Sequence, residues 1–139
     1  QALNFYSGNL VNDNGTIYRI RKNTKIPFTS LTAFKGLGYS LKNVVKGDVS
    51  YYNVSQNDTI NNSKQQHPWG SFLKNGKTIY YSYEGGIIPI PSWNIFLSNG
   101  GSTKLMLPMN TADLKVLKPN PKLPPLTEGD GRVSNTLSH

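Results

Sequence analysis

Short apolar stretches separated by polar turn residues follow one another along this chain, and this pattern is typical of strands joined by tight turns. In the first half, residues 10–11, 16–21 and 25–28 are predicted strands. Residues 12–15 and 22–24 separate them, and Asn and Gly there supply the positive φ that such turns need. The first half is therefore predicted to form a β-meander.

The second half has the same order of elements. Residues 72–73, 78–83 and 87–90 are predicted strands, and residues 74–77 and 84–86 are predicted turns. The third strand of each half contains a proline, which suits an edge strand because proline has no backbone N–H to donate.

A helix-start signal follows each meander. Ser30 and Ser92 stand at N-cap positions, so one or two helical turns are predicted over residues 31–36 and 93–98. Glycines 38 and 100 stand where a left-handed residue would end such a helix. A last strand is predicted at residues 44–45 and at residues 105–107.

The two halves are copies of one unit. When the chain is aligned with itself so that Gly8 falls on Gly70, no gap is needed until Lys42 falls on Lys104, and many of the positions between are identical. The shared residues are those that a fold needs, namely turn glycines, capping serines and apolar side chains. We expect Tyr18/Tyr80, Ile26/Ile88 and Phe34/Phe96 to lie in the core.

The fold class is therefore predicted as mostly β, with two tandem β-meander units of about 60 residues. Each unit has one short helix, and the two are expected to pack as a pseudo-symmetric pair. The predicted divisions are residues 1–62, residues 63–118 and a Pro-rich extended tail over residues 119–139. The tail is expected to be a linker or a mobile end, because its prolines favour extended chain. Gly131 follows Gly70 at nearly the spacing of the repeat and is a candidate start of a third copy.

The composition of the chain indicates which classes of partner and which cellular setting to expect. The net charge is +8, which favours anionic partners such as nucleic acid, teichoic acid or anionic lipid, although solubility alone also explains it. There are no cysteines and no apolar run long enough to span a bilayer. Because the chain begins at Gln1 without a Met, we expect an exported protein whose leader has been removed.

Catalytic and metal-binding patterns are missing from the sequence. His67 is the only histidine besides His139, and it has no Cys, Asp or second His nearby at metal-ligand spacing. A serine nucleophile would need such a base, and no glycine loop for phosphate is present. The sequence therefore predicts a non-enzymatic protein without cofactor or metal.

Candidate binding residues lie where the copies differ. On one face of the second strand, Arg19 and Arg21 in the first copy become Tyr81 and Tyr83 in the second. Arginine and tyrosine can both stack on planar or sugar rings and donate hydrogen bonds, so this face is a candidate ligand surface. The alternative is that both tyrosines pack against the other unit.

Two tryptophans have no counterpart in the first copy. Trp69 lies at the boundary between the units, where it is a candidate ligand contact or a seal of the junction. Trp93 opens the second short helix and is either a core residue or an exposed platform.

The repeat resembles a short tandem module found in many exported bacterial proteins. The similarity is clearest from Tyr80 to Gly100, which includes Ile90-Pro91-Ser92-Trp93 and Phe96. The first copy, with Phe28-Thr29-Ser30-Leu31, departs at the second proline and at the tryptophan. The resemblance implies a cell-envelope setting and no catalytic residue.

Three functions remain open. The first is an extracellular or cell-surface module that binds an anionic or glycan component of an envelope, or an adhesion target. The second is a structural part of a pilus, fibre or phage tail, with a protein partner in a surface assembly. The third is a nucleic-acid binder, which the charge and the aromatic residues favour although no recognised motif is present.

Overall fold

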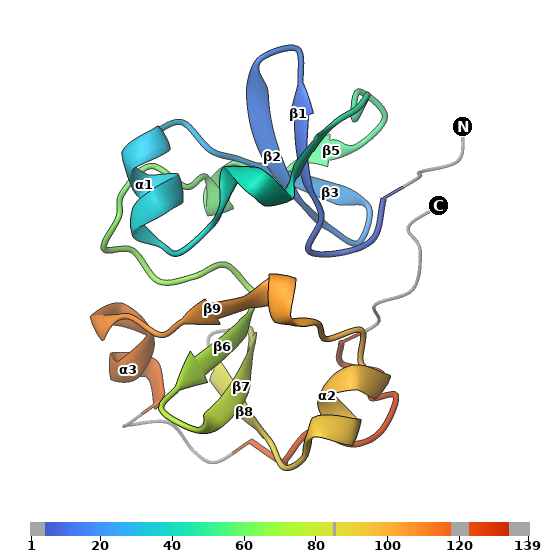
Figure 1. Ribbon diagram of the computed structural model, residues 1–139, viewed down its shortest axis with the longest axis vertical. Coiled ribbons are helices and arrows are strands. Elements are labelled where there is room, and N and C mark those ends of the chain that lie inside the picture. Colours follow the sequence, from blue (N-terminus) through green and yellow to red (C-terminus); the bar gives the residue numbers. More distant parts are fainter. Residues whose placement is uncertain (1–4, 85, 118–122, 134–139) are drawn as a thin grey trace. The chain divides into compact units, whose positions relative to one another are not determined.

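The computed structural model describes residues 5–84, 86–117 and 123–133, and the chain divides between Ser63 and Lys64 into two compact units (Figure 1). The described part is mostly β, with one five-stranded sheet, one four-stranded sheet and three short α-helices. The predicted fold class is confirmed at this level.

The first unit forms the five-stranded sheet, with strand order β4-β1-β2-β3-β5. Its elements are β1 (Leu10–Asp13), β2 (Thr16–Arg21), β3 (Thr24–Pro27), α1 (Leu31–Gly36), the 3-10 helix η1 (Leu41–Asn43), β4 (Val44–Lys46), β5 (Asn53–Val54) and the 3-10 helix η2 (Gln56–Asp58).

The second unit forms the four-stranded sheet, with strand order β8-β7-β6-β9. Its elements are β6 (Phe72–Asn75), β7 (Thr78–Tyr83), β8 (Gly86–Ile90), α2 (Trp93–Ser98), the 3-10 helix η3 (Thr103–Leu105), β9 (Met106–Pro108) and α3 (Thr111–Leu117).

The gapless alignment of the two copies also relates the strand pairings of the two units. Leu10 pairs with Arg19 in the first unit, and Phe72 pairs with Tyr81 in the second. The equivalent strands β4 and β9 lie parallel to β1 and β6. The prediction of a simple meander was therefore incomplete, because the chain crosses over the sheet through the helix before this parallel strand.

The predicted helix ends are confirmed. Ser30 Oγ accepts a hydrogen bond from the N–H of Ala33 at 3.1 Å, and Ser92 Oγ accepts one from the N–H of Ile95 at 3.2 Å. Gly38 and Gly100 have φ values of 99° and 81°, which a residue with a Cβ adopts only with strain. Each short helix is therefore fixed at both ends by local sequence.

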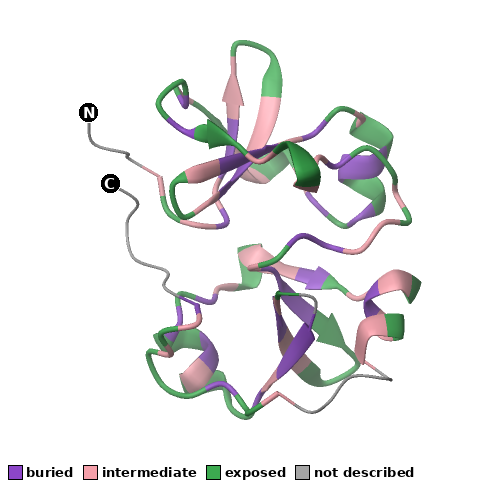
Figure 2. Ribbon diagram, turned by 180° about the vertical axis from the view of Figure 1, so that it is seen from behind, coloured by how far each residue is buried: buried purple, intermediate pink, exposed green. Residues whose placement is uncertain are grey.

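The helix packs on one face of its sheet. Ile26 and Phe34 are fully buried in the first unit, as are Ile88 and Phe96 in the second. Figure 2 colours the buried residues of both units purple. Phe96 contacts Phe72 edge to face at a centroid distance of 5.0 Å. Ile26, Ile88 and both Phe residues are thus core residues as predicted, whereas the tyrosines at 18 and 80 are only half-buried.

In each unit a later segment hydrogen-bonds to the third strand, β3 or β8, and we call it the closing segment (residues 55–62 in the first unit and 123–133 in the second). The N–H of Ile60 donates to Pro27 O at 2.9 Å, and the N–H of Leu126 donates to Pro89 O at 2.9 Å. Both side chains are buried to 1% exposure or less. Pro27 and Pro89 are equivalent positions of the two copies, and the backbone carbonyl of each accepts this hydrogen bond.

The closing segments correct two predictions. The connection between the copies, residues 56–66, is polar and Asn-rich in sequence, which predicts a loop, but it contains η2 and the buried Ile60. Residues 123–133 are not a free tail, because Leu126 and Val133 belong to the core of the second unit. The predicted tail residues 119–122 and 134–139 lie outside the described residues. The predicted third-copy start at Gly131 therefore lies within the segment that closes the second unit.

Candidate binding site

The strand face on which the copies differ is covered, which corrects the expectation that it forms an outer ligand surface. Arg19 is 4% exposed and Tyr81 is 5% exposed. Tyr81 packs on Phe72 at a centroid distance of 5.3 Å, inside the core cluster that contains Phe96. In the second unit this face is covered by α2, because Tyr81 and Phe96 belong to one core cluster.

Arg21 binds the closing segment of its own unit. Its Nη2 atom lies 2.7 Å from Asp58 Oδ2 and 3.3 Å from Ser55 Oγ. Burial raises the pKa of Asp58, but hydrogen bonds from Ser55 and Arg21 outweigh burial, so the pKa is lowered. The arginine thus holds a polar closing segment against β2.

Tyr83 stands at the position of Arg21 in the second copy, and it packs on an apolar core. The core cluster of the second unit includes Tyr83 and Leu123, the latter from its closing segment. Gly86 lies so close to Leu123 that a Cβ there would approach Leu123 Cδ1 to 2.5 Å. The change from arginine to tyrosine therefore accompanies a change from polar partners to an apolar core cluster at this position.

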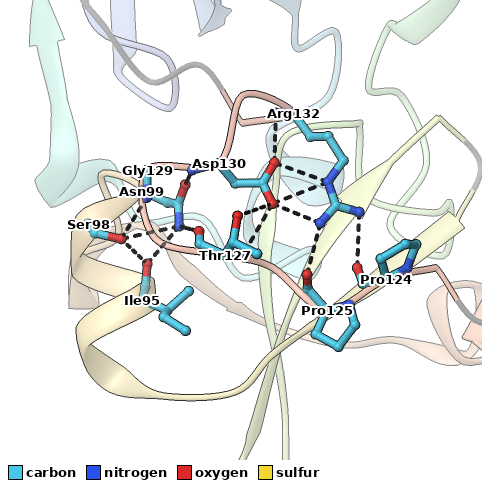
Figure 3. A network of polar contacts seen from close by, with 9 residues as sticks. All are labelled: Ile95, Ser98, Asn99, Pro124, Pro125, Thr127, Gly129, Asp130 and Arg132. Carbon is cyan, nitrogen blue, oxygen red and sulfur yellow. Dashed lines mark hydrogen bonds and ion pairs between the residues drawn. The ribbon is translucent and has the colours of Figure 1, made fainter.

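A polar network fixes the far end of the second closing segment (Figure 3). Arg132 donates to the carbonyl oxygens of Pro124 and Pro125 at 3.0 and 2.9 Å, and its Nη2 lies 2.8 Å from Asp130 Oδ2. Asn99, at the end of α2, donates to Thr127 O and accepts from the N–H of Asp130. Arg132 therefore links residues within the closing segment, and Asn99 links the segment to α2.

The second unit is expected to lose stability as the pH falls below 3.8, the ordinary pKa of an aspartate. Hydrogen bonds from Arg132 lower the pKa of Asp130 and outweigh its desolvation. A group with a lowered folded-state pKa contributes its full stabilisation above the unfolded value and loses it as the pH falls toward the folded one. Urea midpoints at about pH 6 and about pH 2.5, followed by tryptophan fluorescence, measure this loss.

Asp130→Asn is the matched variant for the pH series. It should be less stable than the wild type at the higher pH and should show a smaller drop between the two pH values. Asp58→Asn, in the first unit, is the control for a general charge effect. An undiminished pH dependence in Asp130→Asn would contradict the assignment to this carboxylate.

A buried histidine and aspartate link the chain before β6 to α3 in the second unit. Nδ1 of His67 lies 2.6 Å from Asp113 Oδ2, and both side chains are fully buried. The backbone N–H of His67 donates to Asp113 Oδ1 at 3.0 Å. Asp113 and Asn110 also accept each other's backbone N–H, as in a capping box at the start of α3. Sequence reasoning missed this pair because its members lie far apart in the chain, and only the N-cap spacing of Asn110 and Asp113 gave a signal.

The His67–Asp113 pair lies in the interior of the second unit, close in the chain to two buried serines. Two serines, Ser71 and Ser82, lie on the same unit, but both hydroxyls donate to the carbonyl oxygen of Pro68, at 2.6 and 3.0 Å. All four residues, His67, Asp113, Ser71 and Ser82, are buried. Among residues 5–84, 86–117 and 123–133, no three His, Asp or Glu residues cluster as a metal site would require.

The two tryptophans are the sequence-predicted site residues that reach solvent. Trp69 is 42% exposed and Trp93 is 48% exposed. The ring of Trp93 rests on Phe96 at a centroid distance of 4.8 Å, which fixes its inner side on the core. Leu97, one helical turn later, is also 48% exposed. Of the predicted alternatives for Trp93, the exposed platform is the one found.

Charge is absent around Trp93 in the sequence. No Asp, Glu, Lys or Arg occurs from residue 86 to residue 103. The neighbours on α2 and just before it are Ser92, Asn94 and Ser98, which are exposed and polar but uncharged. Trp93 and Leu97 with these three residues form what we call the α2 face.

An open cleft of about 400 Å³ lies elsewhere on the second unit, beside β6 and β9. Its lining residues are Lys74, Gly76, Met106, Leu107 and Pro108. Lys74 is the one charged side chain in this lining, so the cleft would suit an anionic group.

No family model matches the chain, and neither the curated proteins nor the solved structures contain a match. In the part of the chain that the structure describes, no helix has the length and apolar content to cross a bilayer. The function is therefore inferred from the surface of the chain itself.

Proposed function

We propose that this chain is a non-catalytic, exported surface module that binds a glycan or anionic polymer of a cell envelope. The observation that carries the proposal is the half-exposed ring of Trp93, fixed on Phe96. Large aromatic side chains with a polar edge recur at binding surfaces because they offer contact area at little entropic cost. The burial of His67 with Asp113 also supports a role without catalysis.

The first unit provides an internal comparison for this ring. Leu31 is the residue equivalent to Trp93, and it is 51% exposed. The two positions therefore have similar exposure but different chemistry. The pseudo-symmetric packing of the two units is part of the same proposal, since it would present both helices in one module.

Purified insoluble cell wall tests the proposal. We expect the full chain to sediment with the wall, and we expect Trp93→Ala to reduce the bound fraction at least several-fold. Leu31→Ala is the matched control and should bind as the wild type does, because its side chain has similar exposure but no aromatic ring. A wild-type chain that stays in the supernatant would contradict the proposal.

A structural role in a surface assembly is the second candidate. Trp93 and Leu97 are one helical turn apart and both are half exposed, which also suits contact with an apolar protein surface. This candidate expects self-association or a defined protein partner in light scattering. A monomer at high concentration that binds cell wall would count against it.

A further inference from the structure

We infer that the α2 face binds the ring of an uncharged sugar, with Trp93 as the stacking platform. This inference rests on the proposed function and names the ligand class for its site. It selects the glycan, and not the anionic polymer, as the ligand. The net charge of +8 alone would favour the anionic polymer.

The geometry of the ring is the first step of the argument. One side of Trp93 is held by Phe96 at a centroid distance of 4.8 Å, and about half of the side chain remains exposed. A backed aromatic ring offers a rigid, flat apolar surface. The C–H groups on one side of a pyranose ring are apolar and can stack on such a surface.

The polar groups beside the ring are the second step. The indole N–H of Trp93 and the side-chain amide of Asn94 form no hydrogen bond with any described residue. Both therefore remain available to sugar hydroxyls, which donate and accept hydrogen bonds. Ser98, by contrast, already binds Ile95 O and the N–H of Gly129.

The absence of charge is the third step. The stretch from residue 86 to residue 103 contains no ionisable acid or base, although the chain has 15 Lys and Arg. A phosphate or carboxylate ligand would find no cation among the residues of the α2 face, whereas Lys74 provides one beside the cleft. In the closing segment that binds Ser98, Asp130 and Arg132 pair with each other and the exposed Glu128 adds a negative charge, so the α2 face suits a neutral ring better than an anion.

The first copy lacks this combination at the equivalent positions. Leu31 stands in the place of Trp93, and Lys35 stands in the place of Leu97. The α1 surface is thus aliphatic and cationic. Binding of a neutral sugar should consequently be confined to the second unit.

Intrinsic tryptophan fluorescence of the full chain, titrated with a neutral tetramer of N-acetylglucosamine and with a neutral tetramer of glucose, tests the inference. We expect a saturable change with at least one of them, largely unaffected by a rise in salt. Trp93→Leu, which installs the residue of the first copy and keeps an apolar contact to Phe96, should abolish binding measured by isothermal titration calorimetry, a readout that does not depend on the fluorescence of Trp93. Trp69→Phe removes the other fluorophore and should retain the change, and circular dichroism verifies that each variant is folded.

The outcomes separate this inference from the proposed function. If the chain binds cell wall, responds to neither tetramer, and loses wall binding in Lys74→Ala or at high salt, the inference is overturned while the envelope function stands with an anionic ligand. If neither wall nor tetramer binds, both are overturned. A tetramer response that persists in Trp93→Leu would move the sugar away from the α2 face and overturn the inference.

Discussion

Asp113→Ala is expected to destabilise the second unit by about 3 to 5 kcal/mol, the usual cost of removing one member of a buried polar pair. The carboxylate accepts hydrogen bonds from the backbone N–H of His67 and Asn110 and lies 2.6 Å from the His67 ring. Alanine leaves all three groups buried without this partner and removes the capping box of α3. The total stability of a small domain is of the same order, so the variant should be close to unfolded.

Tryptophan fluorescence measures this effect in the second unit alone, because the only two tryptophans of the chain are Trp69 and Trp93. A urea titration should show the midpoint for Asp113→Ala far below that of the wild type. Asp48→Ala is the matched control, since it removes a carboxylate from the first unit and should leave the tryptophan transition in place. A shift of less than about 1 kcal/mol in Asp113→Ala would refute a structural role for the pair.

Leu126→Ala is expected to destabilise the second unit by about 2 to 5 kcal/mol, the range for truncating a fully buried leucine. Leu126 is 1% exposed and lies in the core cluster that includes Phe96 and Val133. The cavity would open between the closing segment and the sheet. Arg132 binds Asp130 and Pro125 O, and these contacts hold the closing segment on both sides of Leu126. The segment therefore has little freedom to collapse into the cavity.

Ile60→Ala is the matched variant, because Ile60 makes the equivalent hydrogen bond to Pro27 and is fully buried in the first unit. Backbone amide signals in a urea titration distinguish the two units. Leu126→Ala should shift the amides of residues 72–90 to lower urea, and Ile60→Ala should shift those of residues 10–28. Equal shifts of both groups in either variant would be evidence against a separate closing segment for each unit.

Local signals made the elements of each copy predictable. Ser30 and Ser92 cap their helices, and Gly38 and Gly100 end them, because these features depend on residues within one or two turns. The gapless alignment of the copies predicted equivalent elements, and the strand registers follow it.

Long-range contacts made the rest unpredictable. The partner of His67 is 46 residues away, and the partner of Arg21 is 37 residues away. Alternation along β2 and β7 separates two faces but does not say which face a helix will cover. For this reason the divergent pair Arg19/Tyr81 was assigned to the outside, although both residues are buried.

The sequence by itself determined the duplication, the mostly β class and the position of each cap, because each depends on local propensity or on self-similarity. Only the tertiary structure decided that residues 123–133 complete the second unit, since an extended proline-rich segment has no internal hydrogen bonds to reveal its partner. It also decided which aromatic side chains reach solvent. Of the predicted candidates, Trp93 is therefore exposed, whereas Tyr81 is buried and Tyr83 half-buried, because burial depends on what packs against a strand and not on the strand's own residues.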